Sequence, residues 1–330
     1  MSTATAIAHP NIALVKYWGK ADHALILPAT GSLSFTLDIF PTTTEVSLTD
    51  GPEDSVELDG AALTGEESRR VVEVLDLVRE AAGASARARV ISTNTVPTAA
   101  GLASSAAAFA ALATAAAAAY GLETTPAELS RLARRGSGSA CRSIFGGLVR
   151  WDQGTDDATS VARPLEWAGE DLAMIVAVLS SDRKKIGSRA AMKLTEQTSP
   201  YYAGWVASNT VLLERATEAV RAGDYESLGE IAEMSALRMH ASMFGAEPPV
   251  RYLTADSFAL FDAVAELRAE GLLAYASADA GPNVKILCRA REAGDLAARL
   301  RERMAGVTLH TAHAGPGAFL ASEAAPPAAT

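Results

Sequence analysis

One carboxylate lies in a short turn where it could act on a hydroxyl group. Asp279 begins the segment Asp279-Ala-Gly-Pro-Asn283, which separates two apolar runs. A carboxylate held at such a place could orient or deprotonate an alcohol. The alternative is structural, because an aspartate in a glycine-containing turn commonly accepts local backbone N–H bonds. Taken alone, the segment favours that structural role.

A second segment combines small residues, hydroxyl groups and an arginine. Ser137 and Ser139 flank Gly138, and Arg142 follows them closely. The planar guanidinium of arginine matches a carboxylate or a phosphate with two parallel hydrogen bonds. The alternative is a flexible glycine- and serine-rich connector with a solvated arginine, and the segment alone favours this alternative.

A third segment leads into a predicted alanine-rich helix at about residues 104–120. Gly101 allows close approach of the backbone to a ligand, and Ser104 and Ser105 stand at the predicted helix start. Unpaired N–H groups and the positive end of a helix favour an anion such as phosphate. No lysine follows the glycine, so this is not a Walker A loop. A plain serine cap is the alternative.

Two further segments are cationic. His9–Lys20 carries Lys16 and Lys20 together with two aromatic residues, near the end of the first predicted buried strand. Lys184–Arg189 places basic side chains just before a predicted helix. Each could bind an anionic ligand, and each could equally be a solvated strand end or charged loop.

The overall charge excludes some large partners. The chain has 330 residues and a formal net charge of −10, which disfavours nucleic acid and anionic membrane surfaces as partners. A small anionic substrate stays possible, because a local pocket can be basic in an acidic protein. The sequence has no run of about 18 apolar residues that would predict a membrane span. Its first ten residues lack the basic and long apolar regions of a secretory signal.

The cysteines predict no disulfide and no metal site. Cys141 and Cys288 form no CxxC pair and have no metal-ligand spacing. Two distant cysteines in a chain of this size indicate reduced thiols in a cytoplasmic protein.

The elements that must position these residues predict an α+β fold in two halves, divided near residues 180–185. Residues 322–330 are predicted to form a disordered tail. A capping box is expected at Thr64-x-x-Glu67. The predicted strands cover 12–15, 33–37, 45–48, 88–91, 173–179, 272–276 and 284–288. Predicted helices follow Thr64, cover about 104–120, 126–135 and 294–304, surround Leu260–Leu267, and occur several times between 187 and 240.

The joint order of these motifs is more specific than any one of them. The segment Pro97–Ala106 resembles the phosphate loop of the GHMP kinase superfamily. Within that superfamily, Asn11–Lys20, PTAAGLASSA, RRGSGSACRS and DAGPN together resemble the diphosphomevalonate decarboxylases. Further likeness to bacterial members lies at Lys184–Met192, at 238–241 and at 245–249. The likeness runs from about residue 8 to residue 286.

The resemblance implies a GHMP-kinase-like fold with a deep cleft between two α/β sandwiches. Residues 1–182 would form the ATP-binding domain, and residues 183–330 would form the domain that carries Asp279. It also implies a homodimer, Mg²⁺, ATP as cosubstrate and mevalonate 5-diphosphate as substrate. The products would be isopentenyl diphosphate, carbon dioxide, ADP and phosphate.

The resemblance further implies roles for single residues. Asp279 would orient or deprotonate the C3 hydroxyl, Lys20 would lie near Asp279 and the phosphoryl group, and Arg142 would hold the C1 carboxylate. Other substrate contacts would come from Asn11, Tyr17, Ser137, Ser139, Ser188 and Arg189. ATP would contact Ser92 and Asn94 near the nucleoside, and Gly101, Leu102, Ala103, Ser104, Ser105 and Ala106 at its phosphates. Either Arg69 or Arg70 could hold the diphosphate, and no pattern indicates the Mg²⁺ ligands.

Three alternatives remain open. A relative acting on mevalonate 5-phosphate is disfavoured by the intact Trp18-Gly19-Lys20. A GHMP kinase that stops at phosphorylation would have no use for a grip on a departing carboxylate. A non-catalytic ATP-binding homologue would be expected to lack one of Lys20, Arg142 and Asp279, and all three are present.

Overall fold

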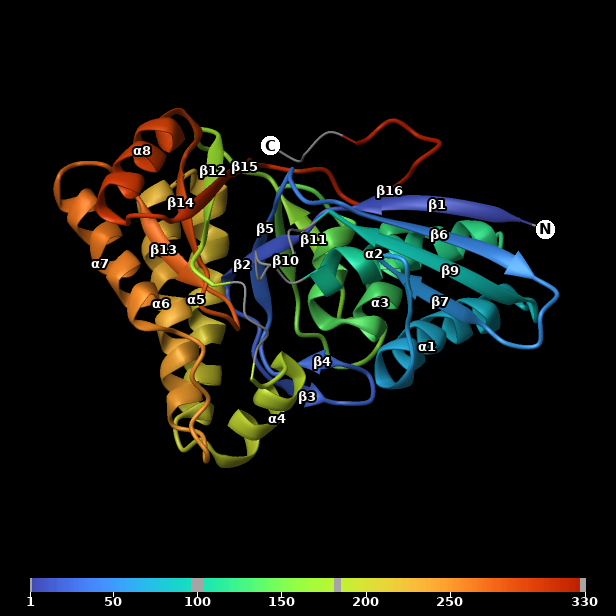
Figure 1. Cartoon of the computed structure of the whole chain (residues 1–330). Helices are drawn as coiled ribbons and strands as arrows, with labels where there is room; N and C mark the ends of the chain where they lie inside the picture. The colour runs from blue at the N-terminus through green and yellow to red at the C-terminus, as the bar shows by residue number, and fades with distance from the viewer. Residues whose placement is uncertain (1, 96–103, 181–184, 327–330) are drawn as a thin grey trace.

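The computed structural model describes residues 2–95, 104–180 and 185–326. The chain forms an α+β molecule with one six-stranded, two four-stranded and one two-stranded sheet, which pack against helices (Figure 1). The strands are β1 (Thr3–Ala8), β2 (Asn11–Val15), β3 (Lys20–Asp22), β4 (Leu27–Pro28), β5 (Ser32–Thr36), β6 (Thr42–Thr49), β7 (Ser55–Leu58), β8 (Ala61–Ala62), β9 (Arg87–Asn94), β10 (Leu148–Trp151), β11 (Ala162–Leu165), β12 (Leu172–Val178), β13 (Tyr275–Ala278), β14 (Val284–Arg289), β15 (Thr308–His313) and β16 (Phe319–Leu320). The helices are α1 (Gly65–Ala82), α2 (Ser104–Ala119), α3 (Pro126–Gly136), α4 (Ser188–Thr198), α5 (Tyr202–Ala222), α6 (Tyr225–Phe244), α7 (Ala255–Ala269) and α8 (Ala293–Arg303), with short 3₁₀ segments η1 (Gly138–Ile144) and η2 (Ala290–Glu292).

The N-terminal half is built on a sheet with the order β16-β1-β6-β9-β7-β8. Helix α2 packs on β1 and β6, and its alanines are almost all buried. Side chains as small as alanine allow the helix to lie close to the sheet. Helix α1 joins the same core through Val71, Val74, Leu75 and Val78, whose spacing gives one apolar face. This packing fixes the start of α2, where Ser105 lies.

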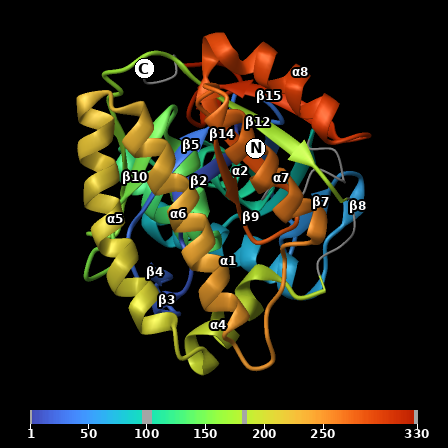
Figure 2. The same cartoon turned by 90° about the vertical axis from the view of Figure 1, so that its left-hand side faces the viewer.

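The centre of the molecule is a sheet with the order β11-β10-β5-β2. Its strands β2 and β5 are buried along their whole length, and the register pairs Asn11 with Thr36. The core beneath this sheet includes residues from β2, β5, α5 and α6, so it joins the two halves of the chain. Figure 2 shows α5, α6 and α7 side by side on the outer face of the molecule.

The C-terminal half contains a sheet with the order β13-β14-β12-β15. The hairpin β13–β14 pairs Ser277 with Lys285 and ends in the turn that carries Asp279. Helices α7 and α8 cover this sheet with the apolar faces of Leu260, Val264 and Leu296. The strands of the hairpin are therefore buried, and its turn points to the middle of the molecule.

Several predicted elements lie where they were expected, and two expectations need correction. Thr64 precedes α1 in an extended conformation, but its side chain makes no cap hydrogen bond, so the predicted capping box is wrong. Gly65 follows with φ of +65°, so the first helical residue lacks the geometry that the box requires. The strand predicted at 272–276 instead covers Tyr275–Ala278.

The proposed division after residue 182 stays a prediction, and two strands pair across it. β12 precedes residue 182 and pairs with β14 and β15. β16 comes from the end of the chain and pairs with β1. Of the predicted tail 322–330, residues 327–330 lie outside the described structure. In the part of the chain that the structure describes, no helix is both long and apolar enough to span a bilayer.

Candidate functional site

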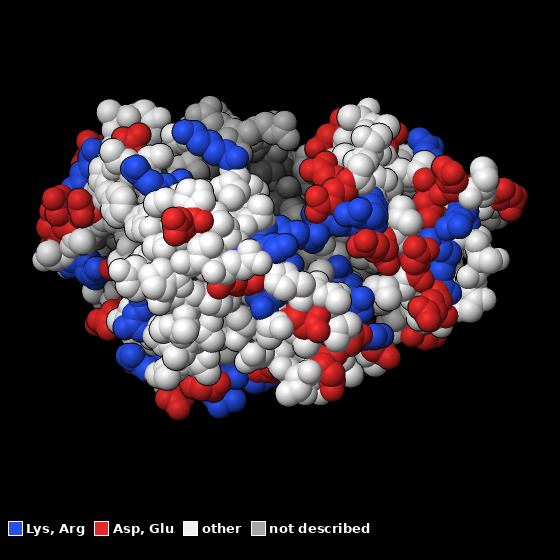
Figure 3. Space-filling model, turned by 90° about the horizontal axis from the view of Figure 1, so that it is seen from below, with Lys and Arg blue, Asp and Glu red and all other residues white. Residues whose placement is uncertain are grey.

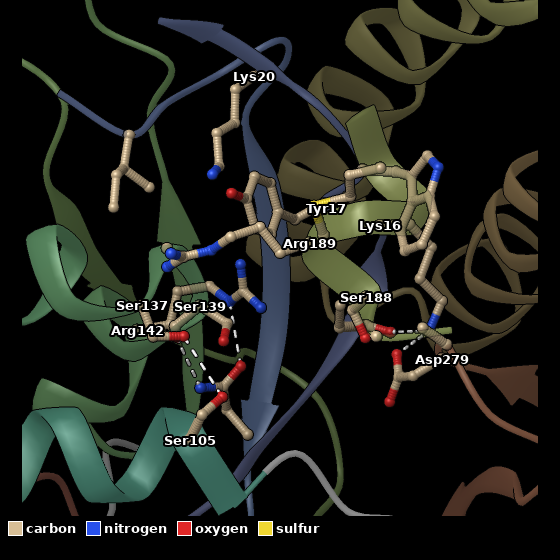
Figure 4. A pocket seen from close by; sticks show the side chains of 18 of the residues that line it. Lys16, Tyr17, Lys20, Ser105, Ser137, Ser139, Arg142, Ser188, Arg189 and Asp279 are labelled. Carbon is tan, nitrogen blue, oxygen red and sulfur yellow. Dashed lines mark hydrogen bonds and ion pairs between the residues drawn. The ribbon is translucent and has the colours of Figure 1, made fainter. Parts of the chain in front are cut away.

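A cavity of about 350 Å³ lies between the two halves. Its walls come from the segment after β2, from η1, and from the starts of α2 and α4, with the β13–β14 turn at one end. Figure 4 shows how these side chains converge from separate elements. The lining includes Asn11, Lys16, Tyr17, Lys20, Arg70, Ser105, Ser137, Ser139, Arg142, Ser188, Arg189 and Asp279.

At one end of the cavity, Asp279 lies between two buried lysines. Lys16 Nζ donates a hydrogen bond of 2.7 Å to Asp279 Oδ1 and another of 2.7 Å to the carbonyl oxygen of Ala13. Lys285 Nζ lies 3.7 Å from Asp279 Oδ2. Burial lowers the pKa of both lysines, and attraction to Asp279 opposes that shift. The carboxylate thus faces the cavity with a cation beside each oxygen.

The prediction that Lys20 lies near Asp279 is wrong, because Lys16 occupies that place (Figure 4). β2 ends at Val15, and the chain after it turns away, so two lysines four positions apart reach opposite ends of the cavity. The backbone N–H of Lys20 donates to Glu196, and its ammonium lies near Arg189 and Arg70.

Arg142 is buried and held in one orientation by two partners. Its Nε donates to Asn11 Oδ1 at 3.1 Å, and its Nη1 donates to Ser32 Oγ at 2.7 Å. Asn11 Nδ2 in turn donates to the carbonyl oxygen of Ser139 and to Ser143 Oγ. Asn11 is predicted to contact substrate. In the structure, its side-chain hydrogen bonds instead hold Arg142 and η1 in place. Nη2 of Arg142 makes no hydrogen bond with the described residues and is left for a ligand.

Tyr17, Ser137 and Ser139, which are predicted to contact substrate, line the cavity beside Arg142. Gly138 lets the tyrosine pack there, since a Cβ at residue 138 would come within 2.6 Å of Tyr17 Oη. The Tyr17 ring also contacts Trp151 edge-on, with centroids 4.8 Å apart. Burial raises the pKa of Tyr17, so its hydroxyl stays a neutral hydrogen-bonding group. These three residues form a wall of hydroxyl groups.

The other end of the cavity gathers cations that repel one another. Lys20, Arg70 and Arg189 lie close together there. Burial, followed by the charge of Arg189, lowers the pKa of Lys20 to about 8 and that of Arg70 to about 10. Seen from below, Lys and Arg side chains run across the middle of the face, with acidic side chains beside them (Figure 3). Such a group of cations suits a multiply charged anion.

The structure separates the two candidate arginines of α1. Arg70 lines the cavity and donates to the carbonyl oxygen of Gly136 at 2.7 Å, and its guanidinium lies over the Phe109 ring. Arg69 is exposed and pairs with Glu73 on the outer surface at 3.7 Å. Of these two arginines, Arg70 is therefore the one that a ligand in the cavity could contact.

A second cavity of about 160 Å³ adjoins the first and is largely apolar. Ser92 and Asn94 line it from β9, together with the apolar side chains of Val56, Leu58 and Val90. Ser105 and Arg70 line both cavities, so the two spaces meet at the start of α2. Ala106 is buried and lines neither cavity. Gly101, Leu102 and Ala103 lie outside the described residues, as does the side chain of Ser104.

Ser188 and Arg189 begin α4 and line the first cavity from the C-terminal half. Arg189 is half-exposed and lies 3.6 Å from the exposed Glu66 of α1. Both predicted cationic segments thus meet at one cavity, although they are far apart in the sequence.

The donors around the cavity fit a magnesium ion that is held mainly by phosphate. Among the described residues no group of three histidine, cysteine or acidic side chains could hold a metal. Asp279 is the one carboxylate in the described lining. Mg²⁺ commonly keeps several waters and binds through one or two carboxylates plus substrate phosphates. The Asp279 carboxylate and the Ser105 hydroxyl are two of the oxygen donors in the lining that could contribute.

Both cysteines are buried free thiols. Burial raises the pKa of each to about 12, so neither forms a thiolate at neutral pH. Cys141 Sγ instead donates to the carbonyl oxygen of Gly138.

Three residues at the site were not singled out from the sequence. Lys16 enters the prediction only as part of a cationic segment, while Ser32 and Lys285 lie inside buried strands. A lysine in the apolar run Val284–Cys288 is the signal that could have found Lys285, because a buried charge needs a partner.

Comparison with known proteins gives this arrangement a family. Two protein-family models match the chain. The diphosphomevalonate decarboxylase-like N-terminal domain matches residues 8–162, and the mevalonate 5-diphosphate decarboxylase C-terminal domain matches residues 174–319. Human diphosphomevalonate decarboxylase is 36% identical over 312 residues, covering 87% of this chain and 76% of the relative.

Solved structures agree over almost the whole chain. The mevalonate diphosphate decarboxylase from Enterococcus faecalis superposes with a TM-score of 0.90 and 43% identity, covering 97% of this chain and 98% of that one. A structure described as MDDEF in complex with MVAPP, AMPPCP and magnesium gives a TM-score of 0.92 and 44% identity, with coverage of 97% and 98%. The fold is thus of the two-part GHMP-kinase type, as predicted. With both family models matched and these relatives aligned along most of their length, the chain belongs to the diphosphomevalonate decarboxylase family.

Proposed function

We propose that this chain uses ATP to decarboxylate mevalonate 5-diphosphate to isopentenyl diphosphate, after phosphorylating the C3 hydroxyl. One observation carries the proposal. A single cavity holds a carboxylate for a hydroxyl, a fixed guanidinium for a carboxylate and a cluster of cations for a diphosphate. The liganded relative described with MVAPP, AMPPCP and magnesium supports the same pair of substrates.

The second cavity suits the nucleoside of ATP. Its walls are apolar where a base would lie, and Ser92 and Asn94 offer polar groups at one side. Ser105, at the start of α2, then meets the phosphates where the two cavities join. The positive end of the helix favours those phosphates. The transferable phosphate would thus point toward the first cavity.

The organic substrate would span the first cavity from its cationic end to Asp279. Lys20, Arg70 and Arg189 would hold the diphosphate, with the hydroxyls of Tyr17, Ser137, Ser139 and Ser188 as further donors. Arg142 would hold the C1 carboxylate through the part of its fork that the protein leaves open. These contacts fix the C3 hydroxyl near Asp279.

The reaction then proceeds in two steps, phosphorylation of the C3 hydroxyl and loss of carbon dioxide. Asp279 orients the C3 hydroxyl and accepts its proton while the oxygen attacks the terminal phosphorus of ATP, whose bond to the bridging oxygen breaks so that ADP leaves. Phosphorylation turns the C3 oxygen into part of a good leaving group, phosphate. When the C3–O bond breaks, the electrons of the C1–C2 bond form the alkene, and carbon dioxide leaves with phosphate. Lys16 offsets the negative charge that gathers at this end.

Magnesium would be held by the phosphates, and the Ser105 hydroxyl or the Asp279 carboxylate could add a protein ligand. When bound, it neutralises phosphate charge and so favours attack by the hydroxyl oxygen.

Product analysis tests the proposal. The protein is incubated with Mg-ATP and, separately, with mevalonate 5-diphosphate or mevalonate 5-phosphate, and released carbon dioxide and ADP are measured together. We expect equal amounts of both products with the diphosphate. ADP without carbon dioxide would establish a kinase instead, and preference for the monophosphate would move the substrate assignment.

We also propose a cytoplasmic homodimer. The family resemblance and the reduced state of Cys141 and Cys288 support it, as do large apolar side chains on the surface, including Tyr201, Val211 and Phe258. Light scattering coupled to size-exclusion chromatography would give the mass of the assembly. A mass of one chain at micromolar concentration would refute the dimer.

A further inference from the structure

Lys285 contacts neither substrate in the proposed reaction, although it lies against the carboxylate of Asp279. It is fully buried on β14, and its ammonium is 3.7 Å from Asp279 Oδ2. A hydrogen bond of 3.2 Å to the carbonyl oxygen of Asn283 holds the ammonium in place. Because Lys16 takes Oδ1, the two lysines engage different oxygens of one carboxylate.

The two lysines reach Asp279 from different halves of the molecule. Lys16 follows β2, whereas Lys285 belongs to the same hairpin as Asp279 and is paired with Ser277. The turn of this hairpin is itself anchored. Asn283 Oδ1 accepts the N–H groups of Leu179 and Ser180, and the Pro282 carbonyl accepts the Ser257 hydroxyl. The contacts that hold Lys285 beside Asp279 therefore do not involve Lys16.

Balancing the charge of Asp279 does not require Lys285. One carboxylate faces two buried ammonium groups, and Arg142 adds a further positive charge nearby. His240 adds none at neutral pH, because burial, with help from the charge of Lys16, lowers its pKa to about 4. Burying a second cation beside an already paired carboxylate is costly. A residue kept at such a cost points to a role in function rather than in stability.

We propose that Lys285 is a positioning residue, which holds Oδ2 of Asp279 so that the carboxylate keeps one orientation toward the C3 hydroxyl. The inference rests on the proposed function, since it concerns the same reaction. Lys285 is fully buried and does not line the cavity, so it acts only through Asp279. Its loss should slow the reaction without weakening either substrate.

The test compares Lys285→Met with the unchanged chain and with Lys193→Met, a change at an exposed lysine of α4. We expect kcat of Lys285→Met to fall by about tenfold to a hundredfold, the usual loss when a supporting partner is removed. The KM values for ATP and mevalonate 5-diphosphate should stay within about twofold. The melting temperature should not fall, because Lys16 still pairs with Asp279. Lys193→Met should change none of these.

The outcomes separate the inference from the proposed function. Failure of the unchanged chain to release carbon dioxide would refute the function itself. An active unchanged chain with kcat retained in Lys285→Met would overturn the inference alone, as would a lower melting temperature with kcat unchanged. Should Lys285→Met fail to fold, Lys285→Gln keeps a donor for the Asn283 carbonyl but removes the charge. Its kcat then decides in the same way.

Discussion

At one end of the cavity Lys16 and Lys285 are paired with Asp279, whereas at the other Lys20, Arg70 and Arg189 face each other. The first group is buried and contains its own counter-charge. The second is partly open to solvent, and its nearby carboxylates, Glu66 and Glu196, lie at its edge.

The difference shows two uses of positive charge in one site. Cations that are already paired hold a protein group in a fixed orientation, which helps a chemical step. Cations that repel each other and have acidic neighbours only at their edge are stabilised when an anion binds among them, which helps binding. Substitutions around Asp279, at the paired end, should therefore lower kcat. Substitutions around Lys20, at the unpaired end, should weaken substrate affinity.

The largest effect is expected at the paired end, from Asp279→Asn. This variant keeps the shape of the side chain but loses the group that takes the hydroxyl proton, so kcat should fall by about 10²–10⁴-fold. ATP affinity, measured by calorimetry, should change little. The two buried lysines lose their counter-charge, and the melting temperature should drop as well. More than roughly a tenth of the original kcat in a folded variant would refute the role of Asp279.

Arg142→Lys should give the next largest effect. Lysine keeps the charge but cannot contact Asn11, Ser32 and the substrate carboxylate together. We expect a loss of roughly 2–3 kcal/mol in transition-state stabilisation, measured as kcat/KM for carbon dioxide release. Part of the loss should appear in kcat, because orientation matters most as the carboxylate departs. Arg69→Lys, on the outer face of α1, is the matched control. Equal activity of the two variants would show that Arg142 does not hold the carboxylate.

At the unpaired end, pH should control binding through Lys20. Its pKa is lowered to about 8, so the free protein loses this positive charge as pH rises through that value. Affinity for mevalonate 5-diphosphate should then fall by up to about tenfold per pH unit. Lys20→Arg stays charged and should lose this dependence between pH 7 and 9 in calorimetric titrations. An identical pH profile in both proteins would assign the effect to another group.

The smallest effect is expected from Cys141→Ser, although Cys141 lies directly beside Arg142. Its thiol is buried and donates to the Gly138 carbonyl, a bond that a serine hydroxyl can replace. No step of the proposed reaction uses a thiol. We expect kcat/KM within about twofold of the unchanged chain. Loss of activity with an unaltered circular dichroism spectrum would contradict this.

Much of the site was predictable because its polar residues occur in short motifs with few alternatives. Arg142, Tyr17 and Asp279 lie in such motifs, and all three line the cavity. Assigning Lys20 rather than Lys16 to Asp279 failed for a physical reason. Which lysine reaches the turn depends on how the chain leaves β2, and that direction is set by packing between segments distant in sequence.

The fold was predictable where one local signal was strong. The apolar face of α1 and the buried run of β12 lie as expected. Strand β1 was not predicted, because its alternating threonine and alanine residues give little apolar signal. β16 was not predicted either, because its two residues form a strand only by pairing with β1.

The pairing of β16 with β1 has a consequence for how the molecule holds together. After β15 leaves the C-terminal sheet, the chain crosses back and runs against the N-terminal half. There the Gly315 carbonyl accepts the N–H of Gly147, and Leu37 bridges to Ala314. With the central core also shared, neither half can open without breaking contacts of the other. The molecule should therefore melt as a single cooperative unit, and a nascent chain leaves the free edge of β1 uncovered until its last strand has been made.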